Sequence, residues 1–211
     1  MSADSQMNRA LFLDRDGVIN RMVKYNYGWD SPQKPRDARL VAGIEKVISW
    51  ANANGILVLE VSNQPGVAKG KMSRETSEAI EEKIHSLVKE KAAVIDKTYI
   101  CPHHPEAIVP KLQKVCDCRK PKPGLFIQAA AEFKLDLKNC VLLGDKATDI
   151  EAGTSIGCTS IIFIHDEDTK DKVEVAQQVK ADYNALSMKE VLKIVTYLNT
   201  NRHPGGNVSD R

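Results

Sequence analysis

Short aliphatic runs alternate along this chain with segments of helical periodicity, and this alternation constrains the fold more than any other feature. Between Ile44 and Ala51 apolar residues recur at i, i+3, i+4 and i+7, and after Gly55 the apolar run at 56–61 (ILVLEV) suits a buried strand. The predicted strands cover 9–14, 56–61, 94–100, 140–143 and 159–164; the predicted helices cover 41–54, 74–91, 125–134, 148–156, a stretch from 173 and another from 187. Strands joined by helices form βαβ units, so we expect an α/β fold: a Rossmann-like parallel sheet with helices on both faces.

Length and composition indicate one globular domain. The chain has 211 residues, 42% of them hydrophobic, and we expect a single domain over 1–199 followed by a flexible polar tail at 200–211. The polar N-terminus lacks signal-peptide character and no apolar run approaches the ~20 residues that span a bilayer, which predicts a cytoplasmic protein without a membrane partner. A net charge of +2 gives no sign of a nucleic-acid partner, and we expect a monomer. Ser187 and Glu190 are spaced as a helix capping box.

Two carboxylates follow the first predicted strand. In open α/β sheets the chemistry collects beyond the carboxyl ends of the strands, and there the sequence reads Asp14-Arg15-Asp16-Gly17. One carboxylate could attack phosphorus while the other protonates the leaving oxygen and later activates water. A solvated loop or a simple divalent-metal site explains this pair alone equally well.

Two further segments carry groups suited to phosphate. Ser62, Asn63 and Gln64 follow the second predicted strand in a Pro/Gly turn, where a hydroxyl and backbone N–H groups can hold phosphate oxygens. Arg119 and Lys120 precede the helix at 125–134 and could neutralise anionic oxygens. An ordinary turn and a solvated basic loop are the competing interpretations.

A third carboxylate follows the predicted strand at 140–143. Asp145 could complete a Mg²⁺ site with Asp14, whereas Asp149 could simply favour the first turn of the next helix. Each of the four segments is weak evidence alone. Because each lies after a strand or next to a helix start, together they predict one phosphoryl-transfer site.

The order FLDRDG, SNQPG, RKP and GDKATD resembles the four motifs of the haloacid dehalogenase superfamily of aspartate-nucleophile phosphatases, over residues 10–198. The resemblance implies that Asp14 is the nucleophile and Asp16 the general acid/base, and that Ser62 and Lys120 stabilise the phosphoryl group. It further implies a catalytic Mg²⁺ held by Asp14, the backbone carbonyl of Asp16 and Asp145. The substrate-binding set that we infer comprises Asp14, Arg15, Asp16, Ser62, Asn63, Gln64, Arg119, Lys120 and Lys146.

Three of the five cysteines lie near one another beside two histidines. Three thiolates and one imidazole form the usual tetrahedral set of a structural Zn²⁺, and here the spacing C-x-H-x₁₂-C-x-C comprises Cys101, His103, Cys116 and Cys118. His104 is the rival ligand, and the resemblance to the family favours His103. Free thiols with an incidental histidine are the alternative. A zinc brace here would hold Arg119 and Lys120 at the active site.

Such a loop is similar to that of two branches of the superfamily, the D-glycero-D-manno-heptose 1,7-bisphosphate 7-phosphatases and the histidinol-phosphatases. The long His-to-Cys interval looks like the heptose branch, which implies hydrolysis of the sugar 7-phosphate, as in lipopolysaccharide carbohydrate metabolism. There Arg119 would recognise substrate and Lys146 would lie near the metal or phosphate. Histidinol phosphate and another sugar phosphate stay open as substrates, as does the anomer of the bisphosphate.

We expect a capless enzyme whose entrance is shaped by the zinc loop and a loop at 20–35. The segment 20–29 is longer than the branch pattern, and its Tyr27 and Trp29 could serve either as sugar platforms or as packing residues. A zinc-braced interaction module without catalysis is disfavoured, because all four acidic and basic motif residues are present. A polynucleotide phosphatase is disfavoured by the charge balance and the lack of a basic aromatic stripe.

Overall fold

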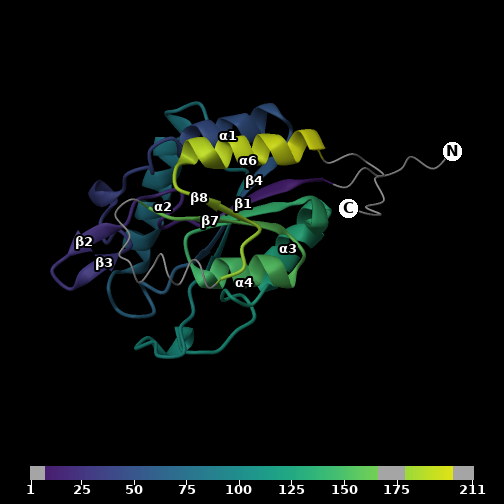
Figure 1. Cartoon of the computed structure of the whole chain (residues 1–211). Coiled ribbons are helices and arrows are strands. Elements are labelled where there is room, and N and C mark those ends of the chain that lie inside the picture. Colours follow the sequence, from purple (N-terminus) through teal and green to yellow (C-terminus); the bar gives the residue numbers. More distant parts are fainter. Residues whose placement is uncertain (1–7, 166–178, 202–211) are drawn as a thin grey trace.

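A parallel sheet of six strands forms the centre of the molecule (Figure 1). The computed structural model describes residues 8–165 and 179–201. The strand order is β5-β4-β1-β6-β7-β8. The strands are β1 (Ala10–Leu13), β4 (Leu57–Asn63), β5 (Lys97–Cys101), β6 (Val141–Gly144), β7 (Thr159–Phe163) and β8 (Tyr183–Ala185). The predicted α/β class with a parallel sheet is therefore confirmed.

Helices cover both faces of the sheet, and β1 shows why. Leu11 and Leu13 belong to the core formed with α1 (Ile44–Ala53), α2 (Arg74–Lys89) and α6 (Met188–Asn201). Ala10 and Phe12 belong to the opposite core, formed with α3 (Gly124–Phe133) and α4 (Ala147–Ser155). Figure 1 shows α1 and α6 side by side over one face and α3 and α4 on the other. A strand buried on both sides reads as a continuous apolar run, which is why the sequence revealed it.

The connections also hold elements that the sequence pattern did not predict. The expected loop at 20–35 contains an antiparallel hairpin of β2 (Val23–Tyr25) and β3 (Gly28–Asp30). Strand β8 was also missed; like each strand of the hairpin, it has only three residues, too few for a periodic signal. Single 3-10 turns occupy η1 (Pro35–Asp37), η2 (Pro110–Leu112) and η3 (Leu137–Asn139).

The C-terminal predictions are met in part. Helix α6 continues to Asn201, past the predicted boundary at 199, while the rest of the predicted tail and the start of the helix predicted from 173 lie outside the described residues. The Ser187 hydroxyl accepts the backbone N–H of Glu190 at 3.3 Å, but the Glu190 carboxylate accepts from Leu186, so only half of the capping box forms. None of the helices in the described part of the chain is long and apolar enough to cross a bilayer.

Candidate active site

The four sequence motifs meet at the carboxyl edge of three adjacent strands. Asp14 directly follows β1, Ser62 lies at the end of β4, Asp145 follows β6, and Lys120 precedes α3. Asp14 and Lys120 are each 3% exposed and Ser62 is 1% exposed. Ionisable groups are rarely buried this deeply unless they compensate one another, so the arrangement indicates a site built for charge.

Lys120 is the cation shared by two buried carboxylates. Its Nζ lies 2.8 Å from Asp14 Oδ1 and 2.6 Å from Asp149 Oδ1, and donates to the carbonyl of Val61 at 2.6 Å. Burial alone would lower the pKa of Lys120, but the two carboxylates outweigh it and raise that pKa. Burial would likewise raise the pKa of Asp14, yet Lys120 and Lys146 lower it to about 2. Asp14 is therefore an ionised carboxylate with an ammonium against one oxygen.

A second ammonium lies among the atoms that the sequence assigned to a metal ion. Lys146 Nζ is 3.6 Å from Asp14 Oδ2 and 3.4 Å from Asp145 Oδ1, and it donates to the backbone carbonyl of Asp16 at 3.3 Å. These three oxygens belong to the three predicted Mg²⁺ ligands. The three oxygens surround the Lys146 ammonium, which is itself a cation. Oxygen ligands grouped in this way are what Mg²⁺ requires.

Asp149 joins this site and was not selected from the sequence. Its Oδ2 accepts the backbone N–H of Lys146 at 3.1 Å and so caps α4, as the sequence suggested, while Oδ1 faces Lys120. Carboxylate oxygens of Asp14, Asp145 and Asp149 lie within 4.8 Å of one another. The sequence signal for Asp149 was its place as the second acid of GDKATD. Because capping of α4 already explains an acid at that position, its contact with Lys120 was not predicted.

Asp16 is fixed by a hydrogen-bond network. Its Oδ2 accepts from Arg15 at 3.0 Å, from the Gln64 amide at 2.6 Å and from the Ser31 hydroxyl at 2.8 Å. Gln64 also donates to Ser62 Oγ at 2.8 Å and accepts from Arg15 at 2.5 Å. The second and first motifs are thus joined by side chains at the site.

The remaining predicted substrate residues use their side chains within the protein. The Asn63 amide both donates to the carbonyl of Lys120, at 3.1 Å, and accepts its N–H, at 3.0 Å. Arg119 donates to the carbonyl of His103 at 3.2 Å. Arg15 is 2% exposed with its guanidinium turned into the protein, so we expect it to reach a substrate only through its backbone.

The predicted zinc ligands lie together. Cys118 Sγ is 3.2 Å from Cys101 Sγ and 3.1 Å from Cys116 Sγ, and His103 Nδ1 is 3.3 Å from Cys118 Sγ. All four candidate ligand atoms lie within 4.8 Å of one another. His104 instead accepts the backbone N–H of Glu106 with its Nδ1. The geometry therefore groups His103 with the three thiols.

The hairpin presents its aromatic residues to solvent. Tyr27 is 60% and Trp29 43% exposed, and Tyr27 stacks on Tyr25 with ring centroids 5.4 Å apart. Ser31, just after β3, contacts Asp16, so the hairpin is anchored at the site. Neither exposed ring is part of the buried core.

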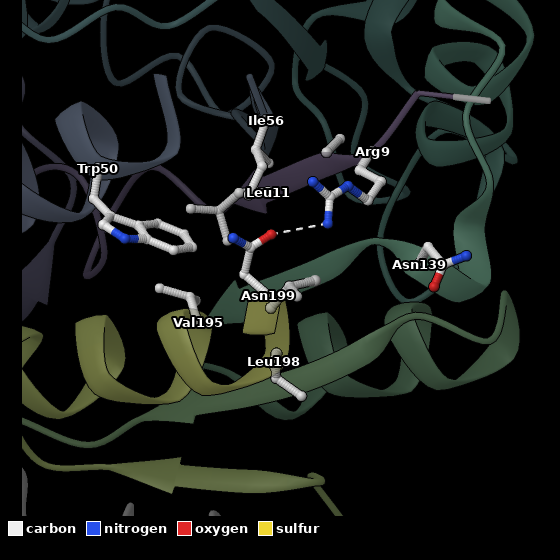
Figure 2. A pocket seen from close by; sticks show the side chains of 10 residues that line it. Arg9, Leu11, Trp50, Ile56, Asn139, Val195, Leu198 and Asn199 are labelled. Atoms are coloured by element: carbon white, nitrogen blue, oxygen red, sulfur yellow. Dashed lines mark hydrogen bonds between the residues drawn. The ribbon is translucent and has the colours of Figure 1, made fainter. Parts of the chain in front are cut away.

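A separate small hollow lies at the other end of the sheet (Figure 2). Arg9, Leu11 and Trp50 are among its lining residues, and a hydrogen bond of 2.9 Å from Arg9 to Asn199 crosses it. Because Leu11 stands near the start of β1 and Asp14 follows its end, this hollow is not part of the site.

Comparison with known proteins agrees with this geometry. A family model described as HAD-hydrolase-like matches residues 117–191. A D-glycero-alpha-D-manno-heptose-1,7-bisphosphate 7-phosphatase of Photorhabdus laumondii is 36% identical over 71% of this chain and 78% of that protein. A D-glycero-beta-D-manno-heptose-1,7-bisphosphate 7-phosphatase of Vibrio cholerae is 36% identical over 74% of this chain and 80% of that protein.

A solved structure shares the fold. The D,D-heptose 1,7-bisphosphate phosphatase of B. bronchiseptica, complexed with magnesium and phosphate, superposes with a TM-score of 0.74 at 24% identity, covering 90% of this chain and 99% of that one. The identity to the two relatives above, over more than two thirds of the chain, extends the likeness from fold to family. The chain belongs to the D-glycero-D-manno-heptose-1,7-bisphosphate 7-phosphatase family of HAD-like hydrolases.

Proposed function

We propose that this protein hydrolyses the 7-phosphate of D-glycero-D-manno-heptose 1,7-bisphosphate, with Mg²⁺, through a phospho-aspartate at Asp14. The observation that carries the proposal is the ionised, buried Asp14 held by Lys120 beside the fixed Asp16. Family membership directs this chemistry toward a sugar bisphosphate. Its partner is therefore a small sugar phosphate rather than a nucleic acid, and the enzyme acts as a monomer in the cytoplasm.

In the first step an oxygen of Asp14 attacks phosphorus and the bond between phosphorus and the sugar oxygen breaks. Asp16 gives its proton to the departing sugar oxygen. Lys120 and Ser62 offset the charge on the phosphoryl oxygens, where positioning and electrostatics dominate the barrier. Asp16 then takes a proton from water as that water attacks the phospho-aspartate, which releases phosphate and restores both carboxyl groups.

Mg²⁺ fits the three oxygens supplied by Asp14, the carbonyl of Asp16 and Asp145. They lie around the Lys146 ammonium, and this arrangement supports a cation at that position. When bound, the ion would supply Lewis-acid neutralisation of the phosphoryl group. The B. bronchiseptica protein, which carries magnesium and phosphate on the same fold, supports this assignment.

Zn²⁺ fits the group of three thiols and one imidazole, as a structural brace without an open position. Cys118 is followed directly by Arg119 and Lys120, so the brace would hold the catalytic lysine.

The site is capless in this proposal, because the chain between β1 and β4 holds only the hairpin, η1 and α1. The hairpin and the zinc loop then shape the entrance, and Tyr27 and Trp29 would serve as sugar platforms.

The test is kcat/KM for phosphate release with Mg²⁺ from three substrates, namely the α and β anomers of the heptose bisphosphate and histidinol phosphate. The relatives named above include both anomeric activities, and we expect a preference of about a hundredfold, about 2.7 kcal/mol, for one heptose anomer. Preference for histidinol phosphate would contradict the substrate proposal.

A second test addresses the nucleophile. Asp14→Asn is expected to abolish turnover while leaving the fold intact. The matched control Asp37→Asn, on the η1 turn, is expected to retain both turnover and fold. Phosphate release by Asp14→Asn at the wild-type rate would refute the assignment of Asp14.

A further inference from the structure

The two carboxylate oxygens of Asp16 have different surroundings. Oδ2 accepts three hydrogen bonds, from Arg15, Gln64 and Ser31, whereas within the described part of the chain Oδ1 has one long contact, 3.4 Å from the Asn20 amide. An oxygen that accepts three donors has no lone pair left for a proton. Oδ1 is therefore the oxygen on which Asp16 can carry the proton that it gives and takes.

Arg15 connects the Asp16 carboxylate with Gln64 and with helix α2. One guanidinium nitrogen donates to Asp16 Oδ2 at 3.0 Å and to Gln64 Oε1 at 2.5 Å, while the other donates to Glu81 Oε2 at 2.9 Å. Arginine suits such bridging because its planar fork fixes the directions of its donors. The orientation of the Asp16 carboxylate thus depends, through Arg15, on Glu81 of α2, which lies outside all four motifs.

Glu81 is itself held in place. His85, one turn further along α2, brings its Nε2 to 3.0 Å from Glu81 Oε1 and 3.3 Å from Oε2 of the fully buried Glu60. The two carboxylates raise the pKa of His85 to about 10. Burial would raise the pKa of Glu81, but His85 and Arg15 outweigh it and lower that pKa to about 2. Two cations therefore face two acidic side chains, and Glu81 stays ionised opposite Arg15.

We propose that Glu81 is a positioning residue of the reaction: by holding Arg15 it keeps Oδ2 of Asp16 hydrogen-bonded and leaves Oδ1 to transfer the proton. This inference rests on the proposed phosphatase function. As the bond between phosphorus and the sugar oxygen breaks, the proton on Oδ1 moves to that oxygen; in the second step Oδ1 takes a proton from the attacking water. Glu81 touches neither substrate nor the reacting atoms.

The experiment compares two substrates that differ in their need for an acid. A sugar oxygen leaves only when protonated, whereas the p-nitrophenolate of p-nitrophenyl phosphate leaves without a proton. Since kcat/KM reports the steps up to release of the first product, it isolates the proton donation. Glu81→Gln is expected to lower kcat/KM by about tenfold or more on the heptose bisphosphate and by less than about twofold on p-nitrophenyl phosphate, because general acid catalysis contributes about 10²–10⁴-fold.

Glu78→Gln is the matched control, because Glu78 lies on the same helix, is 58% exposed and forms a surface ion pair with Arg74. It is expected to match the wild type on both substrates. The ratio of the two kcat/KM values does not depend on the fraction of folded enzyme, so partial unfolding of Glu81→Gln does not mimic the result. If that variant yields no folded protein, Glu81→Asp, which keeps the charge but shortens the side chain, is measured by the same ratio.

An equal fall on both substrates, or no fall on either, would overturn the role of Glu81. A wild-type protein that releases phosphate from neither substrate in the presence of Mg²⁺ would overturn the proposed function instead. The two failures are thus distinguishable in one set of assays.

Discussion

Replacement of Lys120 by methionine removes the cation that two buried carboxylates share. Lys120 Nζ contacts Asp14 Oδ1 at 2.8 Å, Asp149 Oδ1 at 2.6 Å and the Val61 carbonyl at 2.6 Å, with its side chain 2% exposed. Methionine has a similar length but no charge, so the variant leaves two negative groups in a site that water hardly reaches. Breaking a buried ion pair by removing one partner costs about 3–5 kcal/mol.

This cost predicts a clear change in stability. For a chain of about 200 residues each kcal/mol lowers the melting temperature by about 2–4 °C, so Lys120→Met is expected to melt about 6–20 °C below the wild type at pH 7. The measurement is thermal unfolding by circular dichroism with EDTA present, so that divalent ions do not replace the lost charge. Lys122→Met, whose exposed ammonium pairs with Asp117, is expected to stay within about 0.5 kcal/mol of the wild type.

The pH dependence separates charge from packing. In the variant, Asp14 and Asp149 lose their main cation and their pKa values rise, so both can take up protons as the pH falls. The wild-type Asp14, with its pKa of about 2, stays ionised over the same range. The stability difference should therefore narrow between pH 7 and pH 4. A difference that is below about 1 kcal/mol at pH 7, or that does not change with pH, would refute the reasoning.

Three further predictions concern the core, the cluster of Glu60, Glu81 and His85, and the turn after Asp14. Phe12→Ala, which removes a fully buried ring at 5.1 Å from that of Phe126, should lower the free energy of unfolding in urea by about 3–5 kcal/mol. His85→Gln should be less stable than the wild type below pH about 6.5, where His85 is protonated in both folded and unfolded chains. That difference should shrink as the pH rises through the native pKa of about 10, as urea unfolding from pH 6 to 10 would show. Gly17→Ala should lose about 1–3 kcal/mol through strain, since φ is +101°, and its Cβ would overlap Asp145 and lower phosphate release.

The sequence pattern predicted the central sheet well because its strands are buried on both faces. The run from Ala10 to Leu13 is apolar throughout, as expected of a strand buried on both faces. The helices, of 9 to 16 residues, are long enough to show the helical period. The hairpin β2–β3 left none, since each strand has three residues and its aromatic side chains face solvent. Its position at the site follows from the contact between Ser31 and Asp16, which no local pattern contains.

The site was predictable as far as its residues lie in motifs. Asp14, Asp16, Lys120 and Asp145 were selected by their place after strands or before a helix, and the structure brings them together. Glu60 was not, because inside the run at 56–61 it reads as one polar interruption of a buried strand. Its partners Glu81 and His85 lie on α2 and come close to Glu60 only when this helix packs on the sheet. The spacing of the three residues along the chain therefore does not predict that they form a cluster.

Strand β1 lies between β4 and β6, two strands that are synthesised much later than β1 itself. It pairs with β4, Ala10 opposite Leu57, and with β6, Leu11 opposite Val141. Asp14 and Lys120 are 106 residues apart in the chain. Such long-range pairing folds slowly, because loop closure precedes the contacts that compensate it. During synthesis Asp14 is therefore translated long before Lys120, which pairs with it in the folded protein. Strand β1 keeps an open hydrogen-bonding edge until β6 has emerged, and during this interval the site is incomplete and the nascent chain is exposed to wrong pairing.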